Sequence, residues 1–92
     1  MIVRILGEGQ LDLPDDRLDD LNSLDDRLVT AIDTGDEAGF AASLGSLLDA
    51  VRSAGTPLPE DYLGPSELVL PGPGATVGEV RDLLTDEGLI PG

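Results

Sequence analysis

The length, composition and charge of this chain exclude several classes of protein. Its 92 residues allow one compact domain spanning 1–92, because a chain this short cannot divide its hydrophobic core. It has 19 acidic and 5 basic side chains, a formal net charge of −14, so phosphate backbones and anionic membrane surfaces should repel it. We therefore expect neither direct nucleic-acid binding nor direct membrane insertion.

The chain contains no His, no Cys and no Lys. These residue types most often supply a tunable base or an activated nucleophile, so their absence removes most enzyme classes. Paired carboxylates could still support glycoside hydrolysis, but that chemistry needs a deep cleft, which a short chain with 2% aromatic residues can scarcely build. We predict a protein that is not an enzyme and binds no cofactor.

The N-terminal segment predicts a β-hairpin. Ile2 to Leu6 is rich in β-branched residues, Gln10 to Leu13 alternates polar with apolar residues, and Gly7-Glu8-Gly9 forms the turn between them. One face of this hairpin should be buried, and it carries Val3, Ile5, Leu11 and Leu13.

Neither the opening residues nor any later segment resembles a targeting or membrane-spanning sequence. The opening apolar run is too short for the core of a signal peptide, and no later apolar run approaches the roughly 20 residues that a spanning helix needs. We expect a cytoplasmic protein that would reach the inner face of the membrane only through a partner.

Two amphipathic helices should follow the hairpin. Pro14 and the acidic pair after it open the first helix, whose apolar stripe is Leu18, Leu21, Leu24, Leu28 and Ile32. The segment Thr34 to Glu37 contains a capping-box pattern, with Asp36 as a competing cap, so a second helix starts there and stops near Gly55. Its apolar positions are Phe40, Leu44, Leu47, Leu48 and Val51. So short a link makes the two helices antiparallel.

The remaining segment is rich in proline and then helical. Prolines between Thr56 and Ala75 prevent any helix, and Ser66 to Leu70 can form at most a short edge strand. A second capping-box pattern at Thr76 to Glu79 opens a short third helix, with Val80, Leu83 and Leu84 as its apolar residues, Gly88 as its end, and Leu89-Ile90 folding back as a clasp. The predicted fold class is α+β.

The first helix carries more aspartate than stability explains. The like-charge pairs Asp15–Asp19 and Asp16–Asp20 each cost about 0.2–0.5 kcal/mol if they lie at i, i+4 of one helix. An exposed stripe opposite the leucines is formed by residues seven apart, namely Asp19, Asp26 and Asp33. This stripe is either a solubilising face or a docking strip for a basic partner, where its charge would speed encounter.

Two other features allow a structural and a functional interpretation. One side of the second helix carries only small residues, which would let another helix approach closely: Ala38, Ala41, Ala42 and Gly45. Packing within the chain is the preferred explanation. The acidic loop from Asp33 to Glu37 lacks the EF-hand spacing and fits a capped helix break better than a calcium or magnesium site. We predict no metal site.

Taken in order, these segments resemble the PspA-associated, or PspAA, family. The matching pieces are Met1–Ile5, Leu18–Val29, Gly35–Glu37, Gly55–Pro59, Pro65–Pro71 and Glu87–Gly92. The resemblance implies a non-enzymatic accessory of the phage-shock-type membrane-stress system, acting through a PspA-like coiled coil that assembles on stressed membranes. Two alternatives stay open: an acidic nucleic-acid mimic that binds a basic DNA- or RNA-binding protein, and a small enzyme or metal-binding regulator that uses carboxylates.

Overall fold

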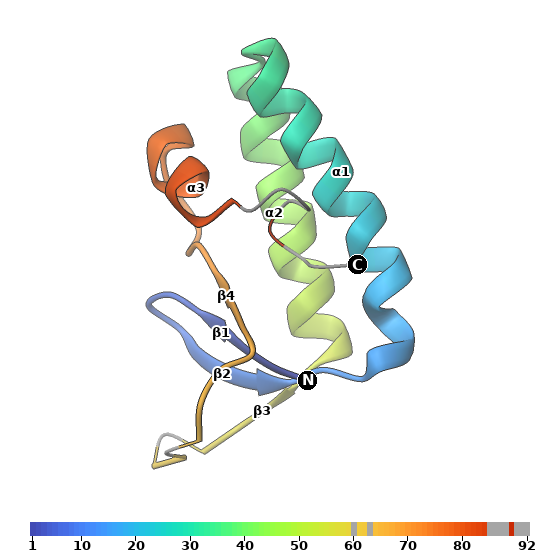
Figure 1. Ribbon diagram of the computed structural model, residues 1–92, viewed down its shortest axis with the longest axis vertical. Helices are drawn as coiled ribbons and strands as arrows, with labels where there is room; N and C mark the ends of the chain where they lie inside the picture. Colours follow the sequence, from blue (N-terminus) through green and yellow to red (C-terminus); the bar gives the residue numbers. More distant parts are fainter. Residues whose placement is uncertain (60, 63, 85–88, 90–92) are drawn as a thin grey trace.

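The computed structural model describes residues 1–59, 61–62, 64–84 and 89 (Figure 1). A hairpin is followed by a 3-10 turn, two long helices, two short strands and a short helix, confirming the predicted α+β class. The elements in chain order are β1 (Ile2–Ile5), β2 (Gly9–Asp12), the 3-10 turn Asp15–Arg17, α1 (Leu18–Thr34), α2 (Glu37–Ala54), β3 (Thr56–Pro57), β4 (Leu68–Leu70) and α3 (Val77–Leu83).

The N-terminal hairpin forms as predicted. Strand β1 pairs with β2 in antiparallel register, with Ile5 opposite Gly9 at the turn end. Gly7 and Gly9 have φ angles of 84° and 120°, a region that glycine adopts without steric cost. The predicted inner face of the hairpin is buried: Val3, Ile5, Leu11 and Leu13.

Four strands form the sheet, in the order β3-β2-β1-β4. Strand β4 pairs with β1 in parallel register and lies at one edge, which confirms the short edge strand expected within Ser66 to Leu70. Strand β3 was not predicted; it pairs antiparallel with β2 at the other edge, where Pro57 lies opposite Leu11. An edge tolerates proline because one side of the strand has no hydrogen-bonding neighbour.

Helix α1 begins later than its acidic opening suggested. Asp15 and Asp16 lie in a 3-10 turn, in which the Arg17 amide donates to the Pro14 carbonyl at 3.2 Å. The tighter 3-10 geometry changes the spacing of side chains, so Asp15–Asp19 and Asp16–Asp20 are not i, i+4 pairs of one α-helix. That part of the prediction is wrong.

The break between α1 and α2 uses Asp36 as its cap and leaves the capping box of Thr34 unused. The Asp36 carboxylate accepts a hydrogen bond from the Gly39 amide at 2.9 Å. Thr34 belongs to the last turn of α1 and donates its hydroxyl to the Thr30 carbonyl at 2.9 Å. Gly35, with φ of 71°, provides the left-handed residue that ends α1.

One hydrophobic core joins the sheet to both long helices, which lie side by side (Figure 1). All five predicted apolar positions of α2 are buried. In α1, Leu21, Leu28 and Ile32 are buried, whereas Leu18 and Leu24 are half-buried. Full burial of such a side chain contributes about 1.5–3 kcal/mol, so this helix pair supplies much of the stabilising apolar area.

The C-terminal part adds one short helix to this core. Both hydrogen bonds of the predicted capping box are present between Thr76 and Glu79, and Val80 is buried. The helix ends at Leu83, and Leu89 is only 3% exposed within the core. Leu84 already has an extended backbone, so the predicted helix that included Leu84 and ended at Gly88 is wrong in its C-terminal extent. Gly88 itself and the clasp residue Ile90 lie outside the described residues.

Candidate functional site

The predicted acidic stripe lies along the outer side of α1. Asp19, Asp26 and Asp33 are all exposed, on the side of the helix opposite the buried residues Leu21 and Leu28. Residues seven apart in an α-helix are separated by about 10 Å along its axis, so the stripe is about 20 Å long. The three carboxylates therefore act on a partner as separate charges spaced beyond the Debye length of about 8 Å.

Hydroxyl groups lie between the stripe carboxylates, and Arg27 beside Asp26 interrupts the negative field locally. Ser23 donates its hydroxyl to the Asp19 carbonyl at 3.3 Å, and Thr30 donates to the Asp26 carbonyl at 2.9 Å. Within the described part of the chain, none of the three stripe carboxylates forms an ion pair. Their charge is consequently available to a partner.

Asp33 occupies a position that opposes helix stability. It lies in the last turn of α1, where the helix dipole is negative, and no basic residue of that turn offsets it. An acidic residue there costs a few tenths of a kcal/mol up to about 1 kcal/mol. The charge of Asp33, at this end of the stripe, therefore lowers the stability of α1 locally.

A buried carboxylate that was not predicted from the sequence lies on the inner side of the same helix. Asp25 is 2% exposed, and its Oδ1 accepts a hydrogen bond from the Leu89 amide at 3.2 Å. The spacing offered a signal, because Asp25 lies four residues after Leu21 and three before Leu28, within the apolar stripe. Asp25 links α1 to Leu89, beyond α3. Because its carboxylate is buried, we assign it a role in holding the fold together.

The small residues of α2 do not pack within the chain. Ala38, Ala41, Ala42 and Gly45 are exposed, so the preferred explanation, intramolecular packing, is wrong. The core is filled from the opposite side of α2 by larger residues, which turns the small residues outward. Gly39 is explained by the cap, since an added Cβ would collide with the Asp36 carboxylate, whereas nothing lies within 4 Å of a Cβ added at Gly45.

A family profile described as PspA-Associated protein, PspAA, matches residues 1–92. The chain belongs to the PspAA family. Searches of curated proteins and of solved structures found no match. The match confirms the resemblance seen in the sequence and covers both the acidic α1 and the small-residue face of α2.

Two other kinds of functional feature are absent from the part of the chain that the structure describes. In residues 1–59, 61–62, 64–84 and 89, no three carboxylates lie close enough together to hold a metal ion. Among the helices of the described chain, none is both long enough and apolar enough to cross a bilayer.

Proposed function

We propose that this PspAA-family protein is a non-enzymatic accessory of the phage-shock-type envelope-stress response, acting in the cytoplasm on a PspA-like coiled coil. The observation that carries the proposal is the family match over residues 1–92, because the family is described by its association with PspA. The formal charge of −14 supports recruitment to a membrane through a partner, since anionic lipid would repel the protein itself.

The acidic stripe is the docking surface that we assign to this partner. A coiled-coil helix repeats its positions every seven residues, so basic side chains at one outer heptad position recur at about 10 Å intervals. Asp19, Asp26 and Asp33 repeat at the same interval on α1. A partner helix lying along α1 could therefore bring one cation to each carboxylate without a change of register.

The same spacing makes nucleic-acid mimicry the weaker alternative. Phosphates follow one another every 3.4 Å or so along the axis of a DNA strand, about three times more densely than the stripe carboxylates. A protein groove that binds a phosphate backbone would therefore find a carboxylate on α1 in place of only some of the phosphates. The heptad-spaced partner uses all three aspartates.

A charge-reversal experiment tests the docking surface. The variant with Asp19, Asp26 and Asp33 changed to Arg should bind the purified PspA-like partner more slowly, with a flatter dependence on salt. The matched control changes three exposed carboxylates away from α1, Asp61, Glu67 and Asp82, and alters the net charge equally. Stopped-flow association at several salt concentrations should separate the two variants; unchanged kinetics in the stripe variant would reject the stripe as the docking site.

Affinity purification from the native host tests the function itself. Recovery of a PspA-like coiled coil would support the accessory role. Recovery of basic DNA- or RNA-binding proteins without any PspA-like chain would favour the mimic. Catalytic turnover of a metabolite by the purified protein, or unaided binding to anionic vesicles, would contradict the accessory role.

A further inference from the structure

A hollow of about 410 Å³ lies at the turn end of β2, on a part of the molecule distant in sequence from the acidic stripe. Its walls come from β1 and β2, from the end of α2, and from the segment after β3: Arg4, Glu8, Gly9, Gln10, Leu11, Arg52, Pro57, Leu58, Pro59 and Tyr62. Strand β3 pairs with Leu11 and Asp12, and the Leu58 amide extends this edge by one hydrogen bond to the Gln10 carbonyl at 2.9 Å, so the hollow lies where the pairing ends.

Internal contacts hold the walls of the hollow in place. Gln10 donates its side-chain amide to the Gly64 carbonyl at 3.1 Å and to the Ser66 hydroxyl at 2.8 Å, which holds the segment between β3 and β4 against the sheet. Tyr62 lies so close over Gly64 that an added Cβ would collide with its ring and hydroxyl. Glu8 accepts a hydrogen bond from Arg52 Nε at 2.8 Å, joining the hairpin turn to α2. The site is therefore preorganised.

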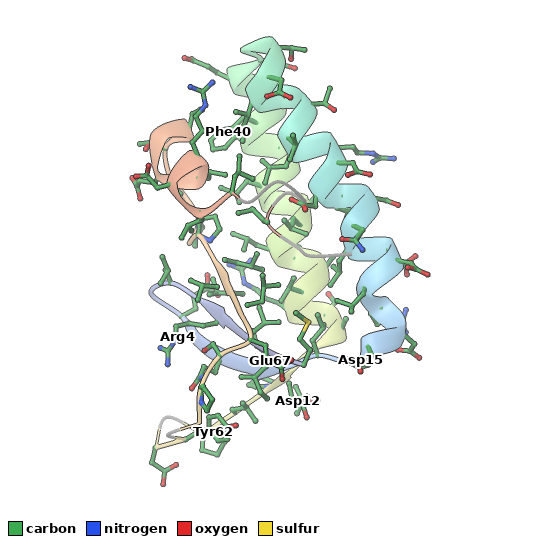
Figure 2. All side chains as sticks on the ribbon, viewed as in Figure 1. Arg4, Asp12, Asp15, Phe40, Tyr62 and Glu67 are labelled. Atoms are coloured by element: carbon green, nitrogen blue, oxygen red, sulfur yellow. The ribbon has the colours of Figure 1, made fainter. Side chains whose placement is uncertain are left out.

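The polar groups left for a ligand are Arg4 and Tyr62. Arg4 projects from the central strand β1 on the side away from the helices, above the segment that carries Tyr62 (Figure 2). Among the described residues, Arg4 forms no ion pair and the Tyr62 hydroxyl no hydrogen bond, whereas Glu8 and Arg52 pair with one another. The residues directly opposite Arg4 are the uncharged Gln10 and Val69. The acidic residues Asp12 of β2 and Glu67, just before β4, lie two positions further along, at diagonal positions. A guanidinium and a hydroxyl in this arrangement favour a carboxylate.

The form of the hollow favours a peptide over a small metabolite. Sites for small molecules usually bury 70–90% or so of the ligand surface. Here Arg4, Glu8, Pro57 and Pro59 are exposed, so a ligand would lie along the surface. Pro57, Leu58 and the Tyr62 ring provide an apolar wall beside the guanidinium. Repulsion from the rest of the acidic protein is screened beyond about 8 Å, whereas the contact with Arg4 is direct.

We propose that this hollow binds a short, extended acidic peptide segment of a protein partner, with a Glu or Asp carboxylate on Arg4 and an adjacent apolar side chain against Leu58 and Tyr62. The surface is separate from the stripe on α1 and complementary to it in charge. A partner could thus present basic residues to α1 and an acidic segment to the sheet. The two contacts are independent in their chemistry and can be tested one at a time.

A random peptide library displayed on phage is the probe, selected in parallel on the full-length protein and on its Arg4→Gln variant. Peptides selected only by the unmodified protein should carry an acidic residue next to an apolar one. The proposal is overturned if acidic residues are not enriched, or if both proteins select the same sequences. Arg4 is exposed, and circular dichroism will show that the variant remains folded.

A synthetic peptide with a selected sequence then locates the site by NMR. It should shift the backbone signals of Arg4, Gln10 and Tyr62, and binding should weaken about tenfold in Arg4→Gln, because a charge-assisted hydrogen bond is lost. The matched control Arg81→Gln removes an equal charge from α3 and should bind normally. Equal weakening in both variants would overturn the proposal, as would sodium succinate binding at the same residues with equal affinity.

Discussion

The two long helices share one core, yet α1 and α2 differ on both their inner and their outer faces. The outer face of α1 carries the aspartate stripe, whereas α2 has no charged residue between Ala38 and Leu48. On the inner side, α1 buries the carboxylate of Asp25, while all buried residues of α2 are apolar. Asp36 caps α2, but α1 has no side-chain cap. Helix α2 is built for stability, and α1 holds charge at a cost to its stability.

The largest expected effect comes from the apolar face of α2. Leu47 is 0% exposed, and the change Leu47→Ala should lower the free energy of unfolding by about 2–5 kcal/mol, since it removes buried area and leaves a cavity. Urea unfolding measures the loss. The exposed change Ala42→Ser on the same helix is the control and should stay within about 0.5 kcal/mol of the parent. A small loss in L47A would show that α2 is not the stabilising element.

A smaller loss is expected at the buried carboxylate of α1. The change Asp25→Ala should cost about 1–3 kcal/mol, because the Leu89 amide loses its acceptor in a buried site. Asp25→Asn keeps an oxygen at that position and should cost less. Amide hydrogen exchange at Leu89 should accelerate in D25A. Parental stability together with unchanged exchange would contradict the structural role given to Asp25.

On the outer face of α2, one substitution is expected to raise the free energy of unfolding. Gly45 lies within the helix with open space around its Cα, so Gly45→Ala should raise the free energy of unfolding by about 1 kcal/mol. Thermal unfolding measures the gain. Gly39→Ala is the comparison and should not stabilise, since the added methyl group would disturb the Asp36 cap. A loss of stability in G45A would mean that the glycine is needed within the folded chain.

At the end of the stripe, stability and binding should change in opposite directions. Asp33→Asn should stabilise α1 by about 0.3–1 kcal/mol, because it removes a negative charge from the negative end of the helix dipole. The same change should slow association with the PspA-like partner. Chemical unfolding and association kinetics on one preparation measure both. If the variant gains stability and binds normally, Asp33 does not take part in docking and the docking surface consists of Asp19 and Asp26 alone.

The smallest effect concerns the ion pair that ties the hairpin turn to α2. The hydrogen bond from Arg52 lowers the pKa of the Glu8 carboxyl below its usual range. A depressed pKa in the folded state gives stabilisation that is present above the unfolded pKa, about 4.3, and is lost as the pH falls through the folded value. The Arg52 and Glu8 side chains are 36% and 34% exposed, and an ion pair in contact with solvent contributes little, so the change should be small. Compared with the parent, Glu8→Gln should unfold with a weaker pH dependence below about pH 4.3.

The acidic stripe on α1 could be predicted from the sequence, because it depends on spacing within one helix. Asp19, Asp26 and Asp33 are seven residues apart in a helical pattern, which is sufficient to place them on one face. The hollow was not accessible, because Arg4 and Tyr62 are brought together by strand order and by the segment between two sheet edges. Likewise, spacing alone could not show whether the small residues of α2 are buried or exposed, because small residues occur both at helix–helix contacts and on solvent-exposed faces.

The sequence by itself determined the hairpin, both long helices, the apolar residues of their inner faces, the start and cap of the third helix, and the acidic stripe. Each depends on contacts between residues close along the chain, where periodicity, turns and caps act. Only the tertiary structure decided the parallel pairing of β4 with β1, the addition of β3, and the burial of Asp25 beneath Leu89. These contacts join distant segments, and their free energy depends on the neighbours that the rest of the fold brings to them.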